Sequence, residues 1–283
     1  MTIVYHFAMV VAFVLICIAG LIGQANDSIR TEAAPPKFVV LVHQRFQFDK
    51  TTESGKALAA AARACANLEV PNSWIVSDSV TGEPEVLSFD PFDSFAHVGK
   101  AFAEWGSIYA AHPELAKSQA QINGALVSQQ TVIAVRRDDL SYRANRIDLS
   151  KARFLRVLEV LMRPGHERKF SEAFQEFNRA YEKNESDLPW VVYEVNAGMP
   201  FPTFLVFMPM RTLAQNDDLL KQWEGLHGAE DAATGRIRQI AREAYAHAES
   251  NLYAISPEKS HVTKEFAAGD PEFWTPQAPA PGK

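Results

Sequence analysis

Two titratable residues interrupt apolar, strand-like segments at matching places in the chain. The segment FVVLVHQRF begins at Phe38, and the segment FLRVLEVLM begins at Phe154. Aligned at their first phenylalanine, the two segments bring His43 and Glu159 to the same position. A carboxylate can tune the pKa of a nearby imidazole and make it a general base, so these two residues are the candidate catalytic pair. Arg45 shares the strand face of His43 by the period of two and is a candidate ligand-binding residue.

A second matched pair consists of the acids Asp78 and Glu194, which follow Trp74 and Trp190 in strand-like segments. Each acid shares a strand face with its tryptophan. We predict that these four residues line the rim of a ligand pocket. The alternative for the acids is protection of a sheet edge, where charges prevent unwanted strand pairing. The alternative for the tryptophans is the hydrophobic core, and for the catalytic pair it is ordinary hydrogen bonding or solvation at a strand end.

These matches belong to a tandem duplication of a unit of about 110 residues, a length that suits a small domain better than a solenoid repeat. Trp190 follows Trp74 by 116 residues, and Trp223 follows Trp105 by 118 residues. Four of the five tryptophans are therefore paired by two nearly equal spacings, which indicates repetition of the whole unit.

Each unit has the pattern of strand, helix, two strands, helix and strand. In the first unit, apolar periodicity and a Gly/Pro turn predict strands over 38–46, 73–80, 85–90 and 131–136. They also predict a helix over 53–68 and a second helical region that Pro113 interrupts before it continues toward Ala125. This order is the split βαβ, ferredoxin-like pattern, so we predict an α+β fold.

One such unit covers only one face of its sheet with helices, and two units can close face to face into a pseudo-two-fold α/β barrel that encloses a pocket. The predicted segments are a signal peptide 1–25, a leader 26–36, repeat one 37–142, a polar linker 143–152, repeat two 153–262 and an unstructured Pro-rich tail 263–283.

In topology and patterning, residues 37–262 resemble the dimeric α/β-barrel superfamily of antibiotic-biosynthesis-monooxygenase-like, EthD-like and NIPSNAP-like proteins. Barrels in that superfamily arise from dimers or from tandem repeats. The resemblance implies, as one option, a cofactor-independent oxygenase or a small isomerase with His43 as the base and Glu159 orienting it. No catalytic motif of these families occurs in the chain.

Composition excludes several other classes. The net charge of −6 includes no basic cluster, so we predict no nucleic-acid partner. The sequence has no Walker loop, no G-x-G-x-x-G, no G-x-S-x-G, no H-E-x-x-H and no C-x-x-C. We therefore predict no cofactor and no metal site.

The apolar run from Phe7 to Gly23 precedes a small-x-small pattern that ends at Ala25, which favours cleavage before Asn26. This predicts a periplasmic or secreted protein with no membrane span in the mature chain. The alternative is a retained N-terminal membrane anchor, because the run approaches the length of a bilayer span.

Three function classes are compatible with these features. The first is an exported binding protein that holds a small apolar or aromatic molecule in the barrel lumen. The second is the His/Glu enzyme described above. The third is a structural or interaction protein whose lumen is packed solid. The sequence yields no prediction of the oligomeric state.

Overall fold

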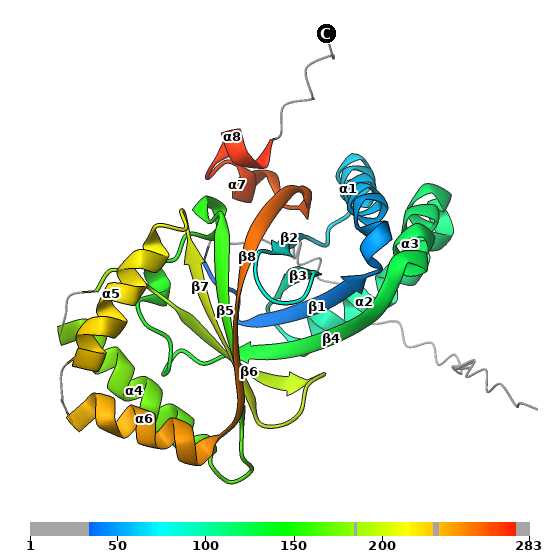
Figure 1. Ribbon diagram of the computed structural model, residues 1–283. Helices are drawn as coiled ribbons and strands as arrows, with labels where there is room; N and C mark the ends of the chain where they lie inside the picture. The colour runs from blue at the N-terminus through cyan, green and yellow to red at the C-terminus, as the bar shows by residue number, and fades with distance from the viewer. Residues whose placement is uncertain (1–33, 184–185, 229–231, 276–283) are drawn as a thin grey trace, which may run out of the picture.

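The computed structural model describes residues 34–183, 186–228 and 232–275. The predicted signal peptide and most of the predicted leader lie outside these residues. Within them, eight strands form one closed barrel in the order β1-β3-β2-β8-β5-β7-β6-β4 (Figure 1). The strands are β1 (Phe38–Phe46), β2 (Trp74–Ser79), β3 (Glu85–Phe92), β4 (Leu126–Arg136), β5 (Phe154–Met162), β6 (Val191–Ala197), β7 (Thr203–Met210) and β8 (Tyr245–His261).

Helices cover the outside of the barrel in two groups, one for each half of the chain. The helices of the first half are α1 (Thr51–Asn67), α2 (Phe95–Ala111) and α3 (Pro113–Ala125). Those of the second half are α4 (Glu167–Lys183), α5 (Gln215–Gly228) and α6 (Ala232–Ala244), and two short helices follow, α7 (Lys264–Ala267) and α8 (Pro271–Trp274). Short 3-10 helices also occur at Phe48–Lys50, Ala144–Arg146 and Leu149–Lys151.

The pairing of strands explains how the two halves close one barrel. Within the first half the strand order is β4-β1-β3-β2, and within the second half it is β8-β5-β7-β6. The halves are joined where β2 pairs with β8 and where β4 pairs with β6, both antiparallel. The prediction of a closed barrel built from mixed helices and strands is therefore confirmed. The origin of the barrel by duplication stays a prediction.

The strands read as nearly continuous apolar runs because both of their faces are covered. In β1, Val39 and Leu41 belong to the core inside the barrel, whereas Val40 packs with Phe92 and Val98 beneath the helices. Because side chains alternate along a strand, His43 follows Leu41 on the inner face. The predicted break at Pro113 is also present, since this proline is the first residue of α3.

The predicted unstructured tail is wrong for the part that the structure describes. Phe266 in α7 is 2% exposed and Trp274 in α8 is 6% exposed, and both belong to the core inside the barrel. The Trp274 indole Nε1 donates to the carbonyl of Ser150 at 2.6 Å. Asp270 forms an ion pair with Arg153, whose guanidinium lies 3.8 Å from the ring centre of Phe273.

The predicted polar linker is also more than a connection. Ile147, Leu149 and Ala152 are buried in the same core cluster as Trp274. The linker and the two short helices therefore close one end of the lumen with apolar side chains, because that end would otherwise expose the inner faces of the strands. Among the residues described, no helix combines the length and apolar character needed to cross a bilayer.

Candidate functional site

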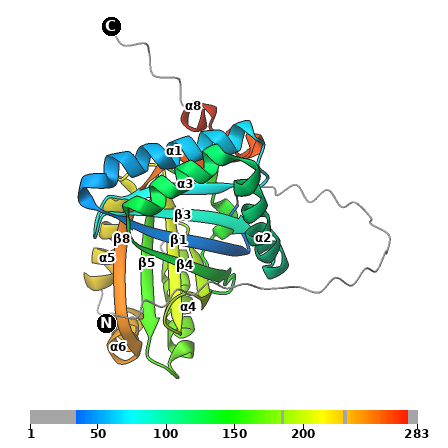
Figure 2. The same cartoon turned by 90° about the vertical axis from the view of Figure 1, so that its right-hand side faces the viewer.

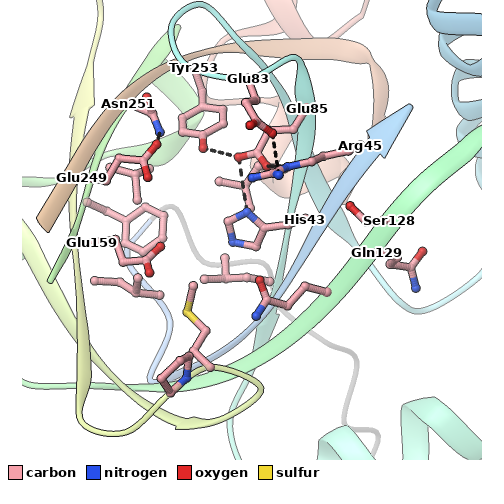
Figure 3. A pocket seen from close by; sticks show the side chains of 18 residues that line it. His43, Arg45, Glu83, Glu85, Ser128, Gln129, Glu159, Glu249, Asn251 and Tyr253 are labelled. Carbon is pink, nitrogen blue, oxygen red and sulfur yellow. Dashed lines mark hydrogen bonds and ion pairs between the residues drawn. The ribbon is translucent and has the colours of Figure 1, made fainter. Parts of the chain in front are cut away.

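The open end of the barrel lumen contains a cavity of about 360 Å³ (Figure 3). Its walls carry titratable and amide side chains from five strands and the turn before β3, and its deeper part is apolar. The polar lining residues are His43, Arg45, Glu83, Glu85, Ser128, Gln129, Gln130, Glu159, Glu249, Asn251 and Tyr253. The apolar lining residues include Leu41, Leu87, Val157, Leu205 and Phe207.

Two tight turns shape the rim of the cavity, and each requires a glycine. Gly82, between β2 and β3, has φ +78, and a Cβ there would lie 2.6 Å from Oδ1 of Asn251. Gly198, between β6 and β7, has φ +100, and a Cβ there would lie 2.1 Å from the carbonyl oxygen of Thr131. Both turns therefore combine a left-handed backbone with close contact to a neighbouring strand. This contact brings Glu83 and Glu85 from one side and residues 199–200 from the other to the cavity.

His43 is held by a carboxylate that the sequence analysis did not identify. Its Nδ1 lies 3.3 Å from Oε1 of Glu85, and the hydroxyl of Tyr253 donates to the same oxygen at 2.5 Å. The side chains of His43 and Glu85 are 17% and 9% exposed. A buried carboxylate between an imidazole and a phenol fixes the ring orientation and favours a proton on Nδ1.

The charges around Glu85 keep it ionised. Burial by itself would raise the pKa of Glu85, but hydrogen bonds from His43 and Tyr253 and the charges of His43 and Arg45 outweigh burial and lower it. Burial, together with the hydrogen bond to Glu85 and its charge, raises the pKa of Tyr253. Tyr253 is therefore a neutral donor and Glu85 an anionic acceptor, which places the proton of a neutral His43 on Nδ1.

The other ring nitrogen, Nε2 of His43, is buried and has no hydrogen-bond partner among the described residues. Figure 3 shows that the ring edge away from Glu85 points into the cavity, toward the side on which Glu159 lies. Buried polar atoms are nearly always hydrogen-bonded, so an unpartnered one at a cavity wall indicates a ligand or water position. With the proton on Nδ1, Nε2 presents a lone pair to whatever occupies the cavity.

Glu159 lines the opposite side of the same cavity. It makes no hydrogen bond or ion pair with any residue that the structure describes, and it lies directly across from Glu249 in the β5–β8 register. Burial raises the pKa of Glu159, the charge of His43 acts against this shift, and the charges of Glu249 and Glu85 add to it. A like charge directly opposite favours the neutral acid, so Glu159 is suited to donate a hydrogen bond or a proton.

Arg45 and Glu249 occupy the mouth of the cavity. The Arg45 guanidinium binds Glu83 at 2.5 Å and lies 3.6 Å from Oε2 of Glu85. Its side chain is about half exposed, so it can contact an entering ligand. Glu249 accepts a hydrogen bond from Nδ2 of Asn251 at 2.7 Å. The mouth is therefore rich in charge, whereas the deeper part is apolar.

The other four predicted ligand-binding residues do not line this cavity. Trp74, Asp78, Trp190 and Glu194 do share strand faces as predicted, but those faces point outward. Asp78 binds Nζ of Lys259 at 2.7 Å, and Glu194 binds Arg137 at 2.6 Å.

The two tryptophans pack beneath the helices of their respective halves. The ring of Trp74 lies 6.0 Å from that of Trp105, and its Nε1 donates to the carbonyl of Lys259 at 3.1 Å. Trp190 is 3% exposed, stacks on Tyr142 at 4.9 Å and donates to the carbonyl of Leu140. The structure therefore places His43, Arg45 and Glu159 in one cavity, whereas the two tryptophans and their acids lie on the outer faces of the strands.

Sequence reasoning missed Glu85, Glu249 and Tyr253, which complete the site. Glu85 shares the period-two face of Leu87 and Phe89, and Tyr253 shares that of Ile255, all of them inner-core residues. This alternation is the feature of the sequence from which the inner position of Glu85 and Tyr253 could have been predicted. Only the strand register shows that the two side chains meet at His43.

No protein-family model and no curated protein matches the chain. Solved structures do share its fold. An anthrone oxidase-like protein superposes with a TM-score of 0.52 and 12% identity, over 80% of this chain and 93% of the other. A proposed monooxygenase of Fusobacterium nucleatum superposes with a TM-score of 0.50 and 10% identity, over 77% of this chain and 91% of the other. A chlorite dismutase of Candidatus Nitrospira defluvii superposes with a TM-score of 0.48 and 10% identity, over 85% of this chain and 96% of the other. The first two of these structures have ferredoxin-like α/β-barrel folds, and at such identities the likeness concerns the fold alone.

Proposed function

We propose that this protein binds a small organic molecule in the cavity at the open end of the lumen. The observation that carries this proposal is the buried, unpartnered Nε2 of His43 in the wall of a cavity of about 360 Å³. Ligand pockets typically combine an apolar body with a few convergent polar groups, and this cavity has both. Its existence also speaks against a lumen packed solid.

The arrangement of the lining refines the class of ligand. The predicted ligand was apolar or aromatic, which suits the deeper part around Val157 and Phe207. Because the mouth carries Glu159, Glu249 and Arg45, the ligand needs a polar end as well. An amphipathic molecule with an apolar body and a hydrogen-bonding head fits both parts of the cavity.

A second candidate function is proton-transfer catalysis in the same cavity. It is favoured by the Glu85–His43 contact, which leaves the lone pair of Nε2 available and stabilises the imidazolium that would form. His43 takes a proton from an acidic C–H or O–H group of the ligand, and Glu159 supplies a proton to the developing oxyanion. An isomerase returns the first proton at another carbon. In a cofactor-independent oxygenase, Glu159 would instead only hydrogen-bond the oxyanion, and the carbanion centre would give its electrons to dioxygen and form a C–O bond. The imidazolium of His43 would then protonate the resulting peroxide, and loss of water would leave a carbonyl group.

The fold-level likeness to an anthrone oxidase-like protein makes anthrone a reasonable first substrate for this second function. Oxygen uptake with anthrone that is lost in His43→Gln would support it. The binding function alone would give no turnover in any variant.

Two further predictions complete the proposal. Export after cleavage before Asn26 would place the protein in the periplasm or outside the cell, where it would meet ligands from the environment. A tandem duplication, supported by the same internal order of strands in both halves, would explain why His43 and Glu159 occupy equivalent places at one cavity.

The binding proposal is tested by mass spectrometry of small molecules released from protein purified from its native host. We expect a compound retained by the wild type and by His112→Gln, a control at the junction of α2 and α3, but lost from His43→Gln and Glu159→Gln. Equal retention by all four proteins would show that the lumen cavity is not the binding site.

A further inference from the structure

A second cavity lies on the outer face of the barrel, between the strands of the first half and their helices. Figure 2 shows α1, α2 and α3 in front of the sheet formed by β3, β1 and β4. The space between the two layers has a volume of about 660 Å³. Its apolar lining includes Leu58, Cys65, Trp74, Phe102, Trp105, Tyr109 and Leu115, and its polar lining from the strands includes Gln44, Ser88, Asp90, Gln129 and Thr131.

The unusual member of this lining is the carboxyl group of Asp90. It is partly buried, and its one hydrogen bond among the described residues comes from the hydroxyl of Ser88 at 2.6 Å. Asp90 forms no ion pair with a described residue, and the described lining of the cavity contains no Lys, Arg or His. Burial raises the pKa of Asp90 to about 7, with the Ser88 hydrogen bond acting against the shift. A carboxylate that is partly removed from water and has no cation beside it is stabilised by a cationic partner.

In the second half of the molecule, four of these five polar strand positions carry apolar side chains, and the fifth, Thr131, corresponds to Ser250. By strand register, Gln44, Ser88, Asp90 and Gln129 correspond to Val160, Val206, Met208 and Ala248. There the layer is a packed aromatic core, in which Phe170 stacks on Phe204 at 4.0 Å and on Phe174 at 4.3 Å. The same architecture is therefore filled in one half and left open, with polar groups, in the other.

Aromatic rings line the same cavity as the Asp90 carboxyl group in the first half. The ring centres of Trp74 and Trp105 are 6.0 Å apart, and Tyr109 stacks on Trp105 at 5.4 Å. Indole and phenol rings attract cations through their faces, most strongly where water is excluded. The amide pair of Gln44 and Gln129, joined at 2.9 Å, supplies further polar contacts on the strand side.

We propose that this outer cavity is a second binding site, specific for a small organic cation. The ammonium group of the ligand binds Asp90, and its apolar or aromatic body lies between the sheet and the rings of Trp74 and Trp105. The site is separate from the lumen, because His43 and Gln44 are neighbours in β1 whose side chains point to opposite faces of the sheet. It goes beyond the function proposed for the lumen and does not depend on it.

The site is tested with three primary amines, benzylamine, 2-phenylethylamine and tryptamine, each compared with its alcohol counterpart. Binding to the full chain is measured by calorimetry, and the indole N–H signals of Trp74 and Trp105 are followed by NMR. At least one amine should bind about tenfold or more tightly than its alcohol, since the ion pair between the ammonium group and the Asp90 carboxylate is replaced by a hydrogen bond from a neutral hydroxyl. The two indole signals should shift on binding.

Three variants assign that preference to Asp90. Asp90→Asn should abolish the difference between amine and alcohol. Asp93→Asn, a control at a carboxyl group that is 92% exposed, should retain it. His43→Gln should also retain it, which distinguishes this site from the lumen. Urea unfolding of Asp90→Asn establishes that the variant is folded.

The inference is wrong if no amine binds better than its alcohol, or if Asp90→Asn keeps the preference. It is equally wrong if His43→Gln abolishes the preference, because the amine would then occupy the lumen.

Discussion

The two ends of the barrel lumen are lined by the same strands and carry opposite kinds of side chain. At the closed end, Leu155 of β5 packs in the same core as Leu149 and Trp274. At the open end of β5 lies Glu159, on the same inward face, in a cavity that it shares with His43. The fold tolerates an apolar filling of the lumen, as its closed end shows. The polar end is therefore a feature that folding alone does not require, which is the strongest structural reason to assign it a function.

The largest loss of stability should come from removing part of the apolar cover at the closed end. Replacing the buried indole in Trp274→Ala should lower the free energy of unfolding by about 3–5 kcal/mol, because it removes apolar contacts and leaves a cavity. Urea unfolding measures the change. The matched control is Phe48→Ala, whose ring is 88% exposed in the wild type and whose loss should change stability by less than about 0.5 kcal/mol. Equal losses of stability in the two variants would show that α8 does not close this end of the lumen.

At the open end, Glu85→Gln should have the next largest effect. The variant keeps the side-chain volume but removes the charge that His43 and Tyr253 contact, which should reduce stability near pH 7 by about 1.5–3 kcal/mol. The folded-state pKa of Glu85 lies below its ordinary value, so this contribution is present above that value, near 4.5, and is lost as the pH falls through the lower pKa. Unfolding free energies measured from neutral to acidic pH should therefore converge for the two proteins. A difference that grows in acid would contradict the assignment.

Glu159→Gln should change the pH dependence of the unfolding free energy in the opposite direction. The pKa of Glu159 is raised in the folded state, so the stability that its protonated form contributes is present below the ordinary value of 4.5 and is lost as the pH rises through the raised pKa. The variant carries no such group. The wild type should therefore lose stability relative to Glu159→Gln as the pH rises from acidic to neutral, in the same unfolding experiments. If the wild type instead gains relative stability over that range, Glu159 has a cationic partner.

The same contrast explains what could be predicted from the sequence. The matching places of His43 and Glu159, and the strand face that His43 shares with Arg45, followed from the period of two and from matching the two halves, because both signals are local. The contact between His43 and Glu85 could not be predicted in this way, since it depends on the register of β1 against β3 and on the position of Tyr253 in β8.

Two other expectations failed for physical reasons. Trp74, Asp78, Trp190 and Glu194 were placed on one strand face correctly, but the sequence does not say which face of a strand points into the barrel when both faces are covered. The tail after Thr263 reads as a Pro-rich extension by composition, whereas Phe266 and Trp274 are buried because the barrel end needs an apolar cover.

The central claim is that the polar end of the lumen is a binding site, and the direct test measures ligand content and unfolding free energy on one preparation of His43→Gln. The account predicts that the ligand found in the wild type is absent from the variant, while the free energy of unfolding, measured without ligand, changes by less than about 1 kcal/mol. If the folded variant retains the ligand and its stability falls by more than that, His43 is a structural residue and the claim is wrong.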